Sequence, residues 1–218
     1  MTPVIIKGSI LFNMDCMDYL RELPDNAFEL AIVDPPYGIG IDGQKENKNN
    51  RNPKANRKHH EKKGWDNEIP SKEYFVELQR VSKNQIIWGA NYFVEHLTKA
   101  KKGWIFWFKG QEGLTMSDGE LAYSSFDRPT RQVTINRVEL LKDGTIHPTQ
   151  KPVKLYEWLL TNYAKPGDKI LDTHLGSGSI AIACNNLGYQ LCACELNNDY
   201  FNLACERIKR EAQQERLF

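Results

Sequence analysis

The sequence predicts an α/β fold in which a mostly parallel sheet carries helices on both faces. Short apolar runs alternate with helical patterns along nearly the whole chain. The residues with distinctive chemistry come directly after predicted strands, and ligands of open α/β sheets bind at the carboxyl ends of strands. A chain of 218 residues with 40% hydrophobic content can bury one substantial core, so we expect a single domain over residues 1–218.

The first half of the chain is expected to open with a β-α-β unit. Met17, Leu20 and Leu23 have helical spacing between two apolar runs, and Ser71 is a suitable cap for a later helix. The strands are expected at residues 10–14, 29–33, 85–88 and 104–108. The helices are expected at residues 17–23, 72–81 and 91–97.

The second half continues the alternation after one interruption. In residues 131–146, Val133, Ile135 and Val138 suggest β structure, and residues 142–144 (Lys-Asp-Gly) can form a tight turn, so we predict a hairpin there. Strands follow at residues 169–171 and 190–194. Helices are expected at residues 153–163, 179–187 and 199–213.

Charge is unevenly distributed. The chain has a formal net charge of +1, but residues 44–64 hold about eight Lys or Arg against two acids, which leaves a mildly acidic remainder. We expect a basic, flexible loop at about residues 42–66. Such a loop either neutralises phosphates of a nucleic acid or is only solvated, and charge alone leaves both open.

Cysteine usage and hydropathy bear on the cellular compartment, on metal binding and on membrane association. The five cysteines are odd in number and the chain opens without a secretion-signal pattern, so we expect a reducing cytoplasm. Cys192 and Cys194 fit a buried strand better than a metal pair, and no metal site is expected. No apolar run approaches the length of a membrane span, so no membrane partner is expected.

The segment Asp34-Pro35-Pro36-Tyr37 places a carboxylate at the end of the apolar run at residues 30–33. The two prolines stiffen the loop and remove two N–H donors, so the loop can accept hydrogen bonds but hardly donate them. Asp34 and the Pro35 carbonyl could bind the two hydrogens of an amine, and Tyr37 could stack on a base. Taken alone, the tetrapeptide reads more simply as a proline turn.

A glycine loop follows the strand at residues 169–171 and opens a helix. Its glycines, Gly176 and Gly178, allow a sharp turn and a close approach of the backbone to a ligand. About twenty residues on, Glu195 ends the next predicted strand, where an acid can bind both ribose hydroxyls of an adenosine. Glu195 could also be a solvated capping acid, but together the loop and Glu195 indicate an adenosine-containing cofactor.

These segments together resemble the beta class of DNA amino-methyltransferases. The DPPY loop comes first, His147-Pro148-Thr149-Gln150-Lys151-Pro152 follows and the glycine loop comes last, which is similar to the permuted motif order of that class. The resemblance implies a Rossmann-like S-adenosylmethionine-dependent methyltransferase fold. It implies a catalytic loop of Asp34, Pro35, Pro36 and Tyr37. It further implies cofactor-binding roles for Asp15, Cys16, His147, Thr149, Lys151, Asp172, His174, Gly176, Ser177, Gly178 and Glu195.

The same resemblance implies methyl transfer from S-adenosylmethionine to adenine N6 in DNA by a cytoplasmic, bacterial or phage-encoded enzyme. The alternatives are an N4-cytosine DNA methyltransferase, whose subgroup tends to have Ser at the position of Asp34, and a catalytically inactive nucleic-acid-binding relative. Asn91 is expected at the target-base pocket, and the oligomeric state stays open. The expected phosphate contacts are Lys45, Arg51, Arg57 and Lys58.

Two departures from the resemblance stand out. The glycine loop has Thr173 and His174 where the family more often has Pro-Phe, which leaves their packing on the cofactor open. Family members usually carry a sizeable recognition region before the HPTQKP segment, and here only residues 131–146 stand in its place. The resemblance therefore implies short or relaxed recognition of DNA sequence.

Overall fold

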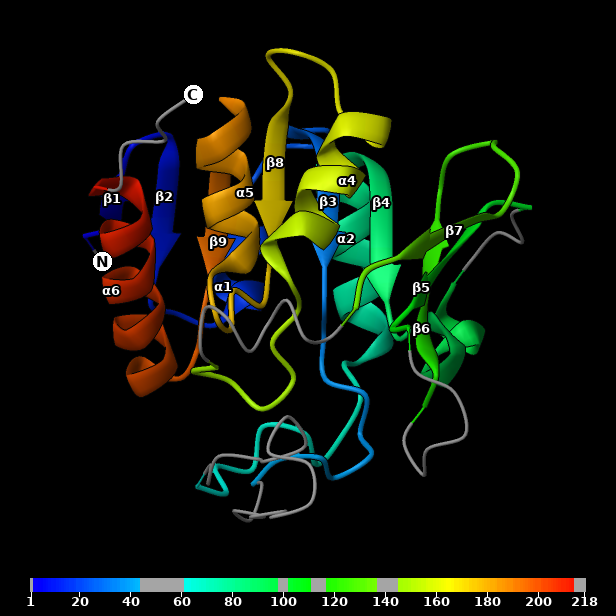
Figure 1. The fold of residues 1–218 in the computed structure, drawn as a ribbon, viewed down its shortest axis with the longest axis horizontal. Helices are drawn as coiled ribbons and strands as arrows, with labels where there is room; N and C mark the ends of the chain where they lie inside the picture. Colours follow the sequence, from blue (N-terminus) through cyan, green and yellow to red (C-terminus); the bar gives the residue numbers. More distant parts are fainter. Residues whose placement is uncertain (1, 44–60, 98–101, 111–116, 137–144, 214–218) are drawn as a thin grey trace.

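The described residues form one nine-stranded sheet with helices packed on it (Figure 1). The computed structural model describes residues 2–43, 61–97, 102–110, 117–136 and 145–213. The strand order is β1-β2-β9-β8-β3-β4-β6-β5-β7. The strands are β1 (Val4–Ile6), β2 (Ser9–Phe12), β3 (Phe28–Val33), β4 (Ser82–Trp88), β5 (Trp104–Phe108), β6 (Gly119–Ser124), β7 (Arg131–Thr134), β8 (Lys169–Asp172) and β9 (Gln190–Cys194).

The central strands β2, β9, β8, β3 and β4 run parallel to one another. β1 is antiparallel to β2 at one end of the sheet, and β6 is antiparallel to both β4 and β5 at the other. Beyond them, β7 pairs in parallel with β5. The carboxyl ends of the parallel strands therefore share one edge, where the loops after β2, β3, β8 and β9 meet.

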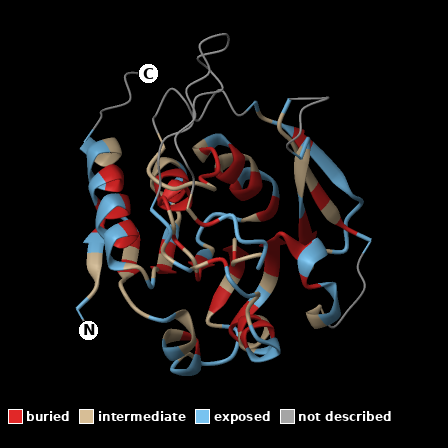
Figure 2. Ribbon diagram, turned by 90° about the horizontal axis from the view of Figure 1, so that it is seen from below, coloured by how far each residue is buried: buried red, intermediate tan, exposed pale blue. Residues whose placement is uncertain are grey.

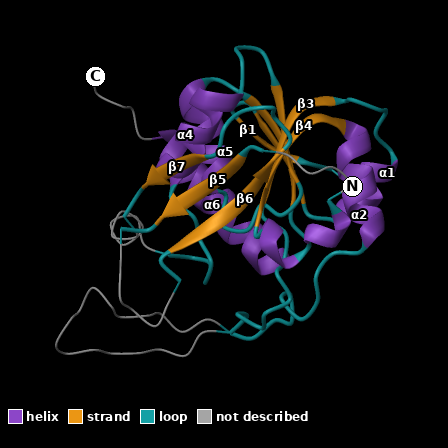
Figure 3. Ribbon diagram, turned by 90° about the vertical axis from the view of Figure 1, so that its right-hand side faces the viewer, coloured by secondary structure: helices purple, strands orange, loops and turns teal. Residues whose placement is uncertain are grey.

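The helices cover both faces of the sheet. Figure 3 shows α1 and α2 on one side and α4, α5 and α6 on the other. Within the described residues, no helix is long and apolar enough to cross a membrane. The helices are α1 (Cys16–Arg21), α2 (Lys72–Val81), α4 (Val153–Tyr163), α5 (Ser179–Leu187) and α6 (Asn198–Gln213), with short 3-10 helices η2 (Ala90–Tyr92) and η3 (Val94–His96).

Each face of the sheet has its own hydrophobic core, and β3 contributes to both. Leu30 and Ile32 pack in the core under α4, α5 and α6, whereas Ala31 and Val33 pack in the core under α1 and α2. Alternate residues of a strand point to opposite faces, so a continuous apolar run fits a strand that is covered on both sides. Figure 2 shows the buried residues gathered on the strands and on the inner sides of the helices.

The predicted alternation of strands and helices is confirmed, and the predicted hairpin is not. Arg131–Thr134 forms a single edge strand that pairs in parallel with β5, and residues 145–146 are outside any strand. Val138 and the expected turn at residues 142–144 lie outside the described residues. The antiparallel partner of β5 is instead β6, which the sequence did not reveal because Gly119 and Glu120 begin it.

Candidate active site

A cavity of about 540 Å³ opens where the carboxyl ends of the parallel strands meet. This volume lies in the range of small-molecule sites. Most of the predicted site residues line it, although they come from loops far apart in the sequence. These residues are Asp15, Cys16, Asp34, Pro36, His147, Thr149, Lys151, His174, Gly176, Ser177 and Glu195.

Several predicted site residues lie elsewhere. Pro35, Tyr37, Asp172 and Gly178 do not line the cavity. Asn91 is exposed in η2 and is likewise absent from the cavity wall. The expected phosphate contacts Lys45, Arg51, Arg57 and Lys58 lie outside the described residues.

The two glycines of the loop have different roles. Gly176 lines the cavity and has a φ of 52°, which favours glycine. Gly178 caps the start of α5 with a φ of 75°, and a Cβ there would lie 2.8 Å from Ile208 Cδ1 of α6. Gly178 thus serves the packing of α5 on α6, and its contact with a cofactor stays a prediction.

Asp172 acts inside the protein and not at the cavity. Its Oδ1 accepts a hydrogen bond from the His174 N–H at 3.0 Å, which fixes the start of the glycine loop. The side chain is buried, and this burial raises the pKa of Asp172 to about 8. Asp172 therefore shapes the loop, and its contact with a cofactor stays a prediction.

Glu195 closes the opposite end of the glycine loop. Its Oε2 accepts from the Gly176 N–H at 2.8 Å and its Oε1 accepts from the Asn197 N–H at 2.9 Å. Burial raises the pKa of Glu195. Because a carboxylate has about four lone-pair sites, these two bonds leave both oxygens able to accept from a ligand in the cavity.

Thr173 and His174, which stand where the family more often has Pro-Phe, both pack against Tyr74 of α2. Thr173 Oγ1 shares a hydrogen bond of 2.7 Å with the Tyr74 hydroxyl of α2 and one of 2.9 Å with His174 Nδ1. Burial lowers the pKa of His174 to about 4, so its ring is neutral near pH 7. The neutral ring lines the cavity and meets Tyr74 edge to face.

Asp15 and Cys16 line the cavity at the start of α1. Asp15 caps this helix, and its Oδ1 accepts from the Met17 N–H at 2.7 Å. Burial raises the pKa of the Cys16 thiol to about 12. Cys16 therefore stays a neutral thiol near pH 7. Since the thiolate is the reactive form, Cys16 is a poor nucleophile there.

Aromatic side chains form another wall of the cavity. The His147 ring lies 5.0 Å from the Trp65 ring and 4.5 Å from the Tyr200 ring. His147 Nδ1 and Thr149 Oγ1 are 3.1 Å apart, which holds the two side chains together. Trp65 and Tyr200 were not predicted from the sequence, since neither belongs to a recognisable motif.

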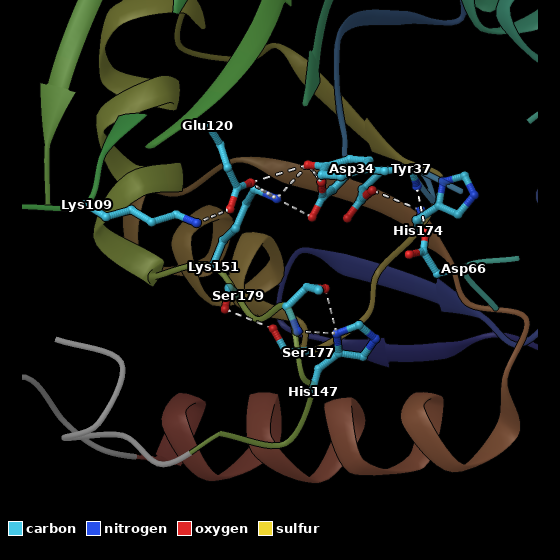
Figure 4. A network of polar contacts seen from close by, with 12 residues as sticks. Asp34, Tyr37, Asp66, Lys109, Glu120, His147, Lys151, His174, Ser177 and Ser179 are labelled. Atoms are coloured by element: carbon cyan, nitrogen blue, oxygen red, sulfur yellow. Dashed lines mark hydrogen bonds and ion pairs between the residues drawn. The ribbon is translucent and has the colours of Figure 1, made fainter. Parts of the chain in front are cut away.

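Asp34 lies in a network of charged and polar groups (Figure 4). Its Oδ1 accepts from the Tyr37 hydroxyl at 2.7 Å, and its Oδ2 lies 2.5 Å from Lys151 Nζ. Lys151 Nζ also lies 3.0 Å from Glu120 Oε2. Burial raises the pKa of Asp34, although the positive charge of Lys151 opposes the shift.

Tyr37 and Lys151 both have protein partners in this network. The Tyr37 ring stacks on Tyr92 with the ring centroids 5.1 Å apart, and its hydroxyl donates to Asp34. Gly89 permits this placement, because a Cβ there would lie 2.0 Å from the Tyr37 ring. The stacking of Tyr37 on a target base stays a prediction. Lys151 lines the cavity, and its ammonium pairs with Asp34 and Glu120, so its contact with the methionine end of a cofactor stays a prediction.

Two aspartates that the sequence reading passed over hold the loops around the cavity. Asp66 accepts from the N–H groups of Tyr37, Gly38 and Ile41 at 2.8, 2.9 and 2.9 Å. Asp42 accepts from the N–H groups of Lys63 and Gly64, which line the cavity. Both acids flank the basic stretch and belong to no motif of the sequence.

The fold and the position of the cavity define a Rossmann-like α/β protein of the methyltransferase type. The DNA methylase family (N6_N4_Mtase) matches residues 58–206, which is more than half of the chain, and the protein belongs to this family. The resemblance of the sequence to the DNA amino-methyltransferases is thereby confirmed.

Individual relatives are more distant. The chain is 25% identical to the Type II methyltransferase M.HpaI of Haemophilus parainfluenzae over 88% of this chain and 71% of that protein. It resembles the crystal structure of an M1.HpyAVI–SAM complex with a TM-score of 0.59, 18% identity and coverage of 92% and 98%. It also resembles the cytosine-N4-specific PvuII DNA methyltransferase with a TM-score of 0.59, 13% identity and coverage of 97% and 88%. The shared fold does not distinguish adenine from cytosine as the target.

Proposed function

We propose that this chain transfers a methyl group from S-adenosylmethionine to the N6 amine of adenine in DNA. The observation that carries the proposal is the place of Asp34: a carboxylate followed by two prolines opens into the same cavity as Gly176 and Glu195. One wall of the cavity thus offers acceptors for an amine, and another offers the glycine and acid expected for an adenosine.

The residues present suit S-adenosylmethionine. The Glu195 carboxylate is largely buried, faces the cavity and keeps lone pairs free for ribose hydroxyls. Gly176, which has no side chain, lets the backbone approach the cofactor, while Cys16 and His174 supply apolar and neutral surface. When bound, this cofactor supplies a methyl group that is already activated by a positively charged sulfur.

The contribution of the protein is to orient the amine and to accept its developing positive charge. Asp34 is the acceptor at the cavity, and Pro36 beside it has no N–H that could compete with the amine as a donor. A target base must leave the duplex to reach Asp34, at a cost of about a few kcal/mol. Arg and Lys in residues 45–58 are proposed to hold the flanking phosphates.

The second candidate is N4 methylation of cytosine, which uses the same amine chemistry. The cytosine-N4-specific PvuII enzyme has a similar fold, so the fold is compatible with this second candidate. Asp34 favours adenine, since the resemblance implies Ser at this position in the N4-cytosine enzymes of this class.

One experiment distinguishes these functions. DNA is incubated with the protein and with S-adenosylmethionine that carries a tritiated methyl group, then hydrolysed to nucleosides and separated. We expect the label in N6-methyladenine. Label in N4-methylcytosine would establish the second candidate, and unlabelled DNA would contradict both and favour an inactive nucleic-acid-binding relative.

A further inference from the structure

Glu120 stands at the centre of the charged network, yet it belongs to none of the recognised segments and does not line the cavity. It comes from β6, and its Oε1 and Oε2 lie 2.7 Å from Lys109 Nζ and 3.0 Å from Lys151 Nζ. The Tyr37 hydroxyl oxygen, whose hydrogen is donated to Asp34, lies 3.3 Å from Oε2. Burial alone would raise the pKa of Glu120, but the two lysines lower it to about 2, so Glu120 is ionised near neutral pH.

Lys151 creates a difficulty for the proposed chemistry. Its ammonium lies beside the Asp34 oxygen and lines the same cavity, and it is almost fully buried, with 3% of the side chain exposed. Burial would lower the pKa of Lys151, but Asp34 and Glu120 raise it, so the lysine stays charged. Positive charge arrives on the amine during transfer, and a neighbouring ammonium would repel it and weaken the pull of Asp34.

Glu120 removes this difficulty because it gives Lys151 a second negative partner. Asp34, Lys151, Glu120 and Lys109 together carry no net charge, whereas Asp34 and the two lysines without Glu120 would carry one net positive charge. Lys109 approaches Glu120 at Oε1, and Lys151 approaches it at Oε2 (Figure 4). The negative charge nearest the cavity is therefore that of Asp34, at the point where the amine would be.

We propose that Glu120 is a positioning residue that neutralises Lys151, so that the negative charge of Asp34 remains available to the target amine. This inference rests on the proposed function. Glu120 lies in β6, which pairs with the last of the parallel strands, β4, and carries no recognised motif. Glu120 acts through Lys151 and does not touch the reacting atoms.

The first test is Glu120→Gln, which keeps the shape of the side chain and removes its charge. We expect kcat to fall by at least about tenfold, the effect of one pKa unit of charge interaction. We also expect the acid limb of the kcat–pH profile to move to lower pH, because the negative charge of Glu120 helps to raise the pKa of Asp34. The dissociation constant of S-adenosylmethionine, measured by calorimetry, should stay within about twofold of the wild-type value.

The second test adds Lys151→Met to Glu120→Gln. If Glu120 acts by neutralising Lys151, removal of the lysine charge should restore several-fold of the lost kcat. A purely structural role predicts the reverse, since the double variant loses more contacts. A suitable control is Glu29→Gln, which removes another strand glutamate that pairs with a lysine, Lys83, at the amino end of β3; it should behave as wild type.

The outcomes separate the two proposals. Wild-type activity in Glu120→Gln, loss of cofactor binding in that variant, or a double variant no more active than Glu120→Gln would each overturn the inference and leave the proposed function standing. A wild-type protein that methylates neither base would overturn the proposed function and this inference with it. A fall in kcat together with a shifted acid limb and rescue by Lys151→Met would establish the role of Glu120.

Discussion

At the scale of single residues, Asp34 and Glu195 have separate roles in the candidate site. Asp34 contacts Tyr37 and Lys151, whereas Glu195 contacts the backbone of the glycine loop, and the two share only the cavity. Asp34→Ala should therefore lower methyl transfer by at least about 10²-fold, the usual effect of losing one transition-state partner. Calorimetry should still show S-adenosylmethionine binding, and parallel loss of binding would contradict this division.

Asp172 gives a residue-scale prediction about stability and pH. Burial raises its pKa from the ordinary value of 3.8 to about 8, so the folded state holds a proton that the unfolded state releases. Stability must then fall as pH rises between these two values. Asp172→Asn removes the ionisation and can still accept from the His174 N–H, so it should flatten this decline. Urea midpoints measured from pH 4 to pH 9 test this, and an unchanged slope would refute it.

At the scale of elements, two loops are held by two different aspartates, and their loss should have different effects. Asp66→Ala removes the acceptor of three N–H groups in the loop after Asp34, so kcat should fall by about tenfold or more while the cofactor still binds. Asp42→Ala releases Lys63 and Gly64 at the cavity wall, so it should weaken cofactor binding instead.

Kinetics and calorimetry on both variants separate these effects, and each variant serves as the matched control for the other. The same change in both variants would mean that the two loops act as one unit. A fall in the thermal midpoint alone, with kcat and binding preserved, would mean that the aspartates stabilise the fold without placing the site.

The elements also show what the sequence could and could not predict. β3, α2, β5, α4, α5 and β9 follow from periodicity, because long apolar or amphipathic runs bury against both sheet faces. β6 begins with Gly119 and Glu120 and is stabilised by pairing with strands on either side, which local pattern cannot reveal. For the same reason local pattern predicts one arm of a hairpin at Arg131–Thr134, whereas the strand there pairs with β5.

The candidate site was predictable where chemistry sits in a motif at a strand end. Asp34, Gly176 and Glu195 were found in this way and line the cavity. Glu120 and Asp66 were not predicted, because their roles depend on partners far away in the sequence. Glu120 is 83 residues from Tyr37, and Asp66 is 29 residues from Tyr37 and 25 from Ile41. In the sequence, a carboxylate near lysines is typical of a solvated acid, and only the folded structure shows that it is buried.

At the scale of the whole molecule, we predict that the basic stretch sets the affinity for DNA. Replacing Lys45, Arg51, Arg57 and Lys58 with Gln should weaken binding and reduce the slope of log K against log salt by up to about 0.9 for each lost phosphate contact. Lys63 is left in place as a control because it lines the cavity and pairs with Asp199. Fluorescence anisotropy across a salt series measures the slope, and an unchanged slope would leave these residues without a role in DNA binding.

The close contact between Gly43 and Lys62 has a consequence for how such a protein can diversify. A Cβ at Gly43 would lie 2.8 Å from Lys62 Cβ, so the chain departs and returns at nearly the same point. The cost of closing a loop grows only slowly with its length, so we expect a change in the length of the segment between them to have little effect on the stability of the sheet. If this segment meets DNA as proposed, substitutions there can change the preference for DNA while the residues that line the cavity stay the same.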